Sequence, residues 1–254
     1  MSYNNCILIL IITTVFLVNN IPIAFSIEND TELHYTCGTS CEQPFNDIYR
    51  ESRALVMIDL IYNIQSYQGF RSASHAFPTN ISGSEMAYGL ALCRADVAPD
   101  DCKKCVITLI NTTRHHCPES RSGIIWRQLC FVKYSDVDFL GIIDTLNMFS
   151  FWRPSSSAMF PDFTDAATNL TGSLTETAVA SPMFYAHDQF QVMDTGYGPF
   201  TLYGVAQCTR DISTDDCKSC LDSAVTQLAT GSSGAGVFYG SCNLRYEIFN
   251  FSTS

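Results

Sequence analysis

Cysteines at regular spacing are the residues of this chain with the widest choice of chemistry. Two segments share the arrangement Cys-x8-Cys-x2-Cys, and their members are Cys93, Cys102, Cys105, Cys208, Cys217 and Cys220. A Cys-x2-Cys pair at the start of a helix can be a redox centre, and four cysteine or histidine side chains can hold zinc. However, a redox pair has no use for the third cysteine, and the second segment has no histidines to match His115 and His116 near the first. The pattern therefore favours structural disulfides.

The two cysteine segments belong to an internal repeat. The stretch at residues 88–105 returns at residues 203–220 with a constant offset of 115 residues, and the offset becomes 112 further downstream. Self-similarity of this kind marks a duplicated structural unit. We therefore expect two tandem domains, at residues 31–137 and 143–251.

Each copy is expected to be an α+β domain in which two helices pack on an antiparallel sheet. Apolar residues at helical spacing predict a first helix at residues 47–64, and a weaker stripe predicts its counterpart at residues 162–179. Paired aspartates at 100–101 and 215–216 predict the start of a second helix in each copy. Alternating apolar and polar residues at 238–248 predict one strand with one buried face. Disulfides would supplement the limited core of each domain.

The N-terminal segment predicts a secreted protein. The apolar run at residues 6–18 is too short to span a bilayer, and the small residues before Ile27 fit cleavage of a signal peptide at residues 1–26. A second apolar run of spanning length does not follow, so we expect no membrane span in the mature chain. Sequons for N-glycosylation agree with a secretory route, and they lie at Asn29, Asn80, Asn111, Asn169 and Asn250.

The charge and the histidine content argue against two large classes of function. A net charge of −11 disfavours binding to nucleic acid or to an anionic membrane, because both need clustered lysine and arginine. The chain has five histidines and no nucleophile motif beside them. Helix capping explains the paired aspartates without catalysis. We therefore expect no enzyme, no catalytic residue, no cofactor and no metal site.

A comparison of the two copies predicts how the cysteines pair. Removing the signal peptide takes away one of the twelve cysteines and leaves an odd number. The second copy lacks counterparts of two first-copy cysteines, so these two are expected to pair with each other. Cysteines one helical turn apart do not readily bridge within a helix. The favoured bridges are Cys37–Cys117, Cys93–Cys102, Cys105–Cys130, Cys208–Cys217 and Cys220–Cys242. Cys41 is left unpaired, although Cys37 and Cys41 could exchange roles, and a free thiol would allow a disulfide-linked dimer.

These motifs resemble a plant family. The cysteine pattern, Tyr-Gly-Leu-Ala-Leu-Cys93, Leu-Tyr-Gly-Val-Ala-Gln-Cys208-Thr-Arg-Asp and Ser-Cys242-Asn-Leu-Arg-Tyr-Glu-Ile-Phe are similar to the ginkbilobin-homologous (stress-antifungal) domains of cysteine-rich repeat secretory proteins. The resemblance implies a two-helix domain on an antiparallel sheet with the same three-disulfide pattern. It also implies an apoplastic location and a role in stress or defence.

The resemblance further implies a carbohydrate site, because the single-domain antifungal member of the family binds mannose. That site uses an Asn after the first cysteine, an Arg six residues before the last and a Glu five residues after it. The first copy holds Gly38, Ile124 and Ser135 at these positions, and the second holds Arg153, Gly236 and Glu247. Glu247 alone matches and is the one candidate ligand-binding residue. The alternative for Glu247 is a solvated strand residue beside Arg245.

The sequence therefore favours a secreted, non-enzymatic interaction module that binds an extracellular protein. A mannose-binding, lectin-like antifungal protein is the alternative. The aromatic residues Trp126, Trp152 and Tyr239 could serve an interface, but core packing is the favoured interpretation for each of them.

Overall fold

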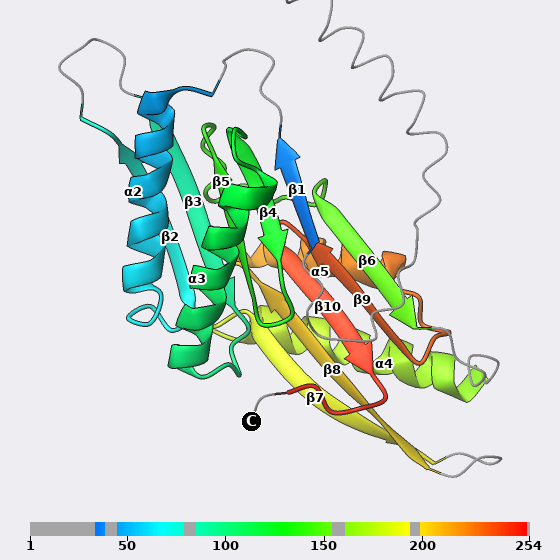
Figure 1. The fold of residues 1–254 in the computed structure, drawn as a ribbon. Coiled ribbons are helices and arrows are strands. Elements are labelled where there is room, and N and C mark those ends of the chain that lie inside the picture. The colour runs from blue at the N-terminus through cyan, green and yellow to red at the C-terminus, as the bar shows by residue number, and fades with distance from the viewer. Residues whose placement is uncertain (1–33, 39–44, 79–84, 154–160, 194–198, 253–254) are drawn as a thin grey trace, which may run out of the picture.

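The computed structural model describes residues 34–38, 45–78, 85–153, 161–193 and 199–252. It consists of two halves with the same order of elements (Figure 1). The first half comprises β1 (His34–Gly38), α2 (Asp47–Asn63), β2 (Phe70–Ala76), β3 (Met86–Cys93), α3 (Pro99–His116), β4 (Ser122–Trp126) and β5 (Cys130–Ser135). The second comprises β6 (Met148–Arg153), α4 (Pro161–Ala180), β7 (Tyr185–Val192), β8 (Phe200–Cys208), α5 (Thr214–Gln227), β9 (Gly234–Tyr239) and β10 (Cys242–Glu247).

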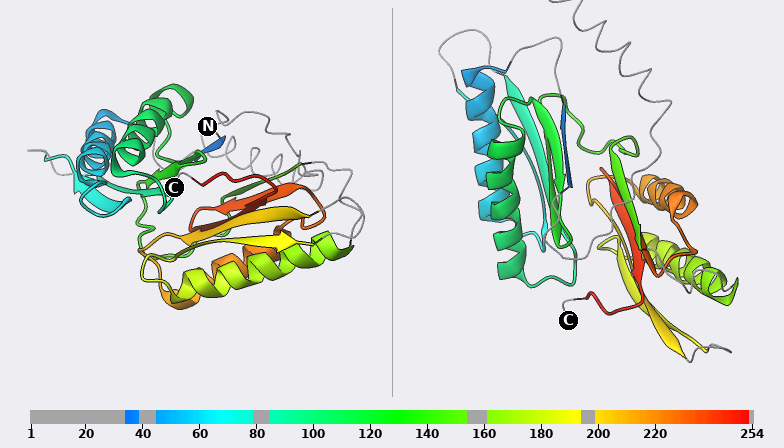
Figure 2. Two further views of the ribbon diagram at one scale, coloured as in Figure 1. Left: turned by 90° about the horizontal axis from the view of Figure 1, so that it is seen from below. Right: turned by 45° about the vertical axis from the view of Figure 1, so that its right-hand side comes forward.

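Each half contains one five-stranded antiparallel sheet, and the strand orders are equivalent: β1-β4-β5-β3-β2 in the first and β6-β9-β10-β8-β7 in the second. Helices α2 and α3 cover the outer face of the first sheet, and α4 and α5 cover the outer face of the second (Figure 2). The inner faces of the sheets are turned toward each other. This arrangement confirms the expected α+β class with two tandem units.

Local capping explains where the helices begin. The side chain of Asn46 accepts a hydrogen bond from the backbone of Tyr49 at the start of α2, and Ser213 does the same for Asp216 in α5. Both are favoured N-cap residue types. Helix α3 instead starts with Pro99, whose fixed backbone angle suits the first helical position. The acidic residues that follow in α3 and α5 interact favourably with the helix dipole.

Three apolar clusters hold the structure together. One lies between each sheet and its own helix pair, with fully buried Leu60 and Leu109 in the first half and Leu221 and Leu244 in the second. The third, here called the inter-sheet cluster, joins the two halves. It consists of Leu90, Leu92, Ile124, Trp126, Phe131, Phe151 and Phe238, with Phe70, Phe139, Leu140 and Phe149 packed against it.

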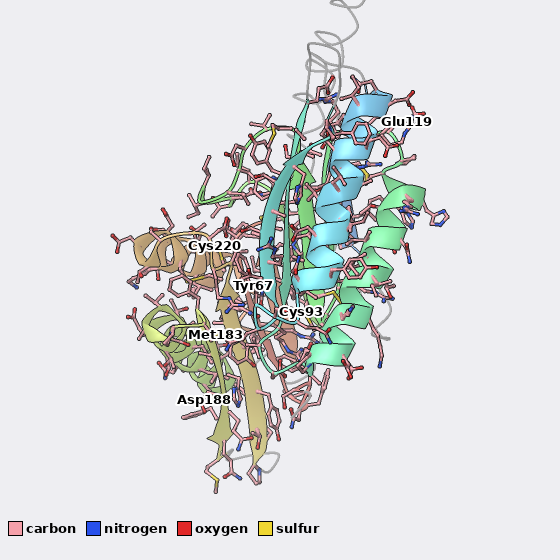
Figure 3. The ribbon with its side chains drawn as sticks, turned by 90° about the vertical axis from the view of Figure 1, so that its left-hand side faces the viewer. Tyr67, Cys93, Glu119, Met183, Asp188 and Cys220 are labelled. Atoms are coloured by element: carbon pink, nitrogen blue, oxygen red, sulfur yellow. A yellow bond between two sulfur atoms is a disulfide. The ribbon has the colours of Figure 1, made fainter. Side chains whose placement is uncertain are left out.

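Polar contacts add to the joint between the halves. The indole of Trp126 donates to the backbone oxygen of Tyr239 at 3.3 Å. The guanidinium of Arg210 donates to the carbonyl of Tyr67 at 2.6 Å and contacts the sulfur of Met183 at 3.1 Å. Figure 3 shows Tyr67 and Met183 near each other on this side of the molecule. The two halves are therefore joined by directed hydrogen bonds as well as by apolar packing.

The predicted single strand at 238–248 is wrong. The chain turns at Gly240 and Ser241, and β9 and β10 are antiparallel neighbours. A Cβ atom on Gly240 would overlap the carboxylate of Asp144, so the glycine leaves room for that side chain beside the turn. Phe238 lies opposite Asn243, and directly paired residues share a face, so Phe238 faces the other half rather than the helices.

The expected solvated face of this strand is also wrong. Only 8% of Arg245 and none of Glu247 is exposed. The inner face of the second sheet is covered by the first half and by the chain after β10, which alternation along one strand does not reveal. Trp126 and Tyr239 are buried as core residues, whereas 40% of Trp152 is exposed.

The five bridges favoured by the sequence are the five disulfides of the described residues. Asn111, Asn169 and Asn250 are exposed. Cys41, Asn29, Asn80 and the expected signal peptide lie outside the described residues. Glycosylation and the dimer through Cys41 stay predictions. In the described part of the chain no helix has the length and apolar character to cross a membrane.

The disulfides should differ in how much they stabilise the first half. Cys37–Cys117 closes a span of 80 residues, and Cys93–Cys102 closes a span of 9. Because a longer closed loop removes more entropy from the unfolded chain, replacing the first pair by serines should cost about 2 kcal/mol more than replacing the second. Denaturant unfolding of both variants measures the two losses. A Trp152→Phe background leaves Trp126 as the fluorescence probe of the first half. Equal losses would contradict the loop-length argument.

Acid should weaken the contact between α2 and β2. Arg71 donates two hydrogen bonds to Asp59, at 2.7 and 3.0 Å, and holds the pKa of that carboxyl well below its usual range. A lowered pKa stabilises the fold above the unfolded pKa of about 4, and this stabilisation is lost as the pH falls. Asp59→Asn should therefore cost about 1 kcal/mol at neutral pH, because solvent screens this partly exposed pair, and less in acid. Unfolding free energies that differ by a constant amount across the acid range would contradict this assignment.

Candidate functional site

The positions of the implied sugar site come together in each half, on the inner face of the sheet. Gly38, Ile124 and Ser135 lie on β1, β4 and β5, which are neighbours in the first sheet, and all three line one cavity. In the second half Arg153 and Glu247 are in direct contact. The sugar-site positions therefore occupy the same part of the sheet in both halves, but the residues around them differ.

The cavity of the first half is a groove of about 370 Å³. One wall is formed by residues of β1, β4 and β5, and the other by the segment of residues 136–147, here called the linker, which leads to β6. We call this cavity the linker groove. Its floor contains small side chains, including Gly38, Ser122 and Ser135.

An ion pair at the linker groove fixes its second wall. The ammonium of Lys133 lies 2.7 Å from the carboxylate of Asp144, and both side chains are largely buried. Asp144 also accepts hydrogen bonds from the backbone of Leu146 and of Asn147. Burial acts to raise the pKa of Asp144, but its bonds with Lys133 and Asn147 outweigh burial and leave the pKa below its usual value. The charge of Lys133 is therefore matched within the chain.

The rim of the linker groove carries exposed apolar side chains. The exposed fractions are 69% for Val137, 59% for Ile142 and 92% for Leu146, and all three line the groove. Isolated apolar residues are common on protein surfaces, but three around one concave site suggest a contact surface.

In the second half the corresponding space is filled. Glu247 is fully buried and binds two guanidinium groups: Arg153 Nε lies 3.0 Å from Oε2, and Arg245 Nη2 lies 2.8 Å from Oε1. Arg245 also stacks on the ring of Phe251 at 4.4 Å. A Cβ atom on Gly234 would overlap the carboxylate of Glu247. The carboxylate is thus committed to contacts inside the protein.

A larger hollow, of about 470 Å³, lies at the start of α3. Among its charged residues, Asp101 binds Lys104 at 3.0 Å and Asp96 binds Arg94, whereas the buried Nε of Arg127 has no hydrogen-bond partner within the described part of the chain. No metal-binding group of three or more His, Cys, Asp or Glu side chains occurs among the described residues. We take the linker groove as the candidate binding site, because exposed Val137, Ile142 and Leu146 surround it and the three positions of the implied sugar site line it.

Sequence reasoning identified the strand positions of this site but missed the linker. The linker falls at the boundary between the expected domains, and no role was assigned to it. A signal was present, because residues 137–143 read Val-Asp-Phe-Leu-Gly-Ile-Ile, which is unusually apolar for a connection. Both expectations for Glu247 assumed a side chain that solvent could reach, whereas the structure encloses it.

Comparisons with known proteins agree with this architecture. A family model described as salt stress response/antifungal matches residues 36–137 and 155–248. An antimicrobial ginkbilobin-2-like protein of Castanea crenata is 40% identical over 172 residues, which cover 66% of this chain and 70% of that protein. Cysteine-rich repeat secretory protein 38 of Arabidopsis thaliana is 32% identical over 229 residues, which cover 88% of this chain and 83% of that protein.

Longer proteins and solved structures match as well. Cysteine-rich receptor-like protein kinase 5 of Arabidopsis thaliana is 27% identical over 239 residues, but these cover only 35% of the kinase. The tandem DUF26 ectodomain of PDLP5 from the same plant superposes with a TM-score of 0.65 at 21% identity, covering 85% of this chain and 98% of that one. This last likeness shows a shared fold. Since the family model covers both halves and the repeat secretory protein matches across them, the chain belongs to the salt stress response/antifungal family, among its cysteine-rich repeat proteins with two tandem domains.

Proposed function

We propose that the mature chain is a secreted, non-enzymatic binding protein of the plant apoplast that recognises another protein during stress or defence. The observation that carries this proposal is the contrast between the equivalent sites of the two halves, one of which is open and the other enclosed. The first half offers a groove with an apolar rim, and the second half encloses Glu247 between Arg153 and Arg245. Neither site offers the Asn, Arg and Glu of the implied sugar site: the first half has Gly38, Ile124 and Ser135 at these positions, and Glu247 of the second half is enclosed.

The expected secretion of the chain supports an extracellular partner. The sequence predicts a signal peptide at residues 1–26, and the relatives include a protein named as secretory. Receptor-like kinases share the tandem domains, so a role as ligand or decoy for such receptors is part of the proposal. The net charge of −11 favours partners with basic surfaces.

A mannose-binding antifungal protein is the second candidate. It is favoured by the 40% identity to an antimicrobial ginkbilobin-2-like protein and by the presence of Glu247 at one of the three sugar-site positions. For this candidate to hold, the carboxylate of Glu247 would have to leave two arginines and turn toward solvent.

A paired binding experiment separates the two candidates. The secreted, purified mature chain is applied to a glycan array that contains oligomannose, and it is also used to retain proteins from apoplastic fluid. We expect no signal on oligomannose and a saturable protein interaction that soluble chain competes away. Millimolar or tighter binding to oligomannose would support the lectin instead. Retention of no specific protein would contradict the proposed function.

A substitution at Glu247 tests whether its role is structural. Glu247→Gln removes the carboxylate that binds buried Arg245 and partly exposed Arg153, so it should reduce the free energy of unfolding by about 3 kcal/mol. The control is Glu176→Gln, which removes an exposed carboxylate 2.7 Å from Lys218 and should cause no measurable loss. Denaturant unfolding compares the two variants. A Glu247→Gln protein of unchanged stability that loses a sugar affinity of the wild type would point to a binding residue.

A further inference from the structure

The linker groove is the open end of the interface between the two halves. Ile124 belongs to the inter-sheet cluster, Phe139 packs against that cluster, and both residues line the groove. Further along the inner face of the first sheet, Phe151 and Phe238 of the second half cover its apolar side chains. At the groove all lining residues come from the first sheet and the linker. The apolar inner face thus extends beyond the part that the second half covers.

The exposure of the rim indicates the size of the occupant. A small molecule confined to 370 Å³ would fill the groove but would leave most of Leu146, which is 92% exposed, in water. Covering Leu146 together with Val137 and Ile142 requires a larger body that spans the rim. The groove volume of about 370 Å³ has room for one large side chain. A side chain held in a pocket with covered surroundings is how protein interfaces concentrate their binding energy.

Charge indicates the chemistry of that body. Lys133 is the cation at the groove, and its charge is matched by Asp144 at 2.7 Å. Exposed Asp138 lies in the linker between Val137 and Phe139, which both line the groove, and the whole chain has a net charge of −11. A second copy of the chain would be repelled, whereas a basic partner would be attracted and oriented.

We propose that the linker groove binds a basic segment of a partner protein, which inserts one aromatic or aliphatic side chain between the inner face of the first sheet and the linker. This inference rests on the proposed function as a protein-binding module and names where and how the partner docks. Basic residues of the segment lie near Asp138 of the linker, and the inserted side chain continues the inter-sheet cluster.

A random peptide library displayed on phage tests the proposal with the secreted mature chain as bait. We expect the selected peptides to combine lysine or arginine with an aromatic or aliphatic residue. Their affinity should fall by at least about tenfold for Val137→Ser/Leu146→Ser, since the inserted side chain loses its apolar rim. It should also weaken as salt is added, because salt screens charge attraction. The matched control is Ile58→Ser, which replaces a half-exposed apolar residue on α2, away from the groove.

The outcomes are distinct. Peptides that bind the wild type and the rim variant equally would overturn the groove assignment while leaving the proposed function intact. Acidic or uncharged selected peptides would overturn the proposed chemistry. Self-association of the wild type that disappears in the rim variant would assign the groove to a second copy instead. Binding of the chain to oligomannose with no peptide selected would contradict the proposed function itself. Circular dichroism of each variant checks that the fold is retained.

Discussion

Burial of the inner faces of the two sheets is the constraint on which the rest of the structure depends. An antiparallel sheet has two faces, and the helix pair of each half covers only one of them. The other face carries Trp126, Phe131, Phe151 and Phe238, which would be exposed in an isolated half. The halves therefore complete each other. This burial also determines the surroundings of every polar side chain on the inner faces, including the two ion pairs that distinguish the copies.

The joint between the halves follows the internal repeat closely. The chain after each last strand folds back so that an aromatic ring meets a cation of its own sheet: Lys133 lies 4.5 Å from the ring of Phe139, and Arg245 lies 4.4 Å from the ring of Phe251. Each of these segments also contacts the other half. The backbone of Gly141 donates to Asp211 at 2.9 Å, and Arg94 donates to the carbonyl of Phe251 at 3.0 Å. Equivalent positions thus form the joint from both sides, which is what two copies of one ancestral surface would do when packed face to face.

Features that are local or repeated could be predicted from the sequence. Features that depend on the contact between the two halves could not. Spacing and copy comparison were enough for the repeat, the helices near residues 47–64 and 162–179, and the pairing pattern of the cysteines. The turn at Gly240 was missed because apolar residues on both sides of it continue the alternation by coincidence. The burial of Glu247 and the linker groove were missed for a deeper reason. Both depend on which part of one sheet face lies against the other half, and no periodicity within a single strand carries that information.

The difference between the copies follows from where each cation finds its counter-charge. The same strand position holds Lys133 in the first half and Arg245 in the second. Arg245 is matched by Glu247, which lies two residues further along the same strand and fills the space beside it. The equivalent of Glu247 in the first half is Ser135, so Lys133 must be matched from elsewhere, and Asp144 of the linker provides the charge. The ion pair ties the linker to β5 at this point, and the groove lies between the linker and β1, β4 and β5. The carboxylate of Glu247 and the hydroxyl of Ser135 thus accompany different counter-charges at one strand position, so two copies of one domain share an interface while their inner faces differ beside it.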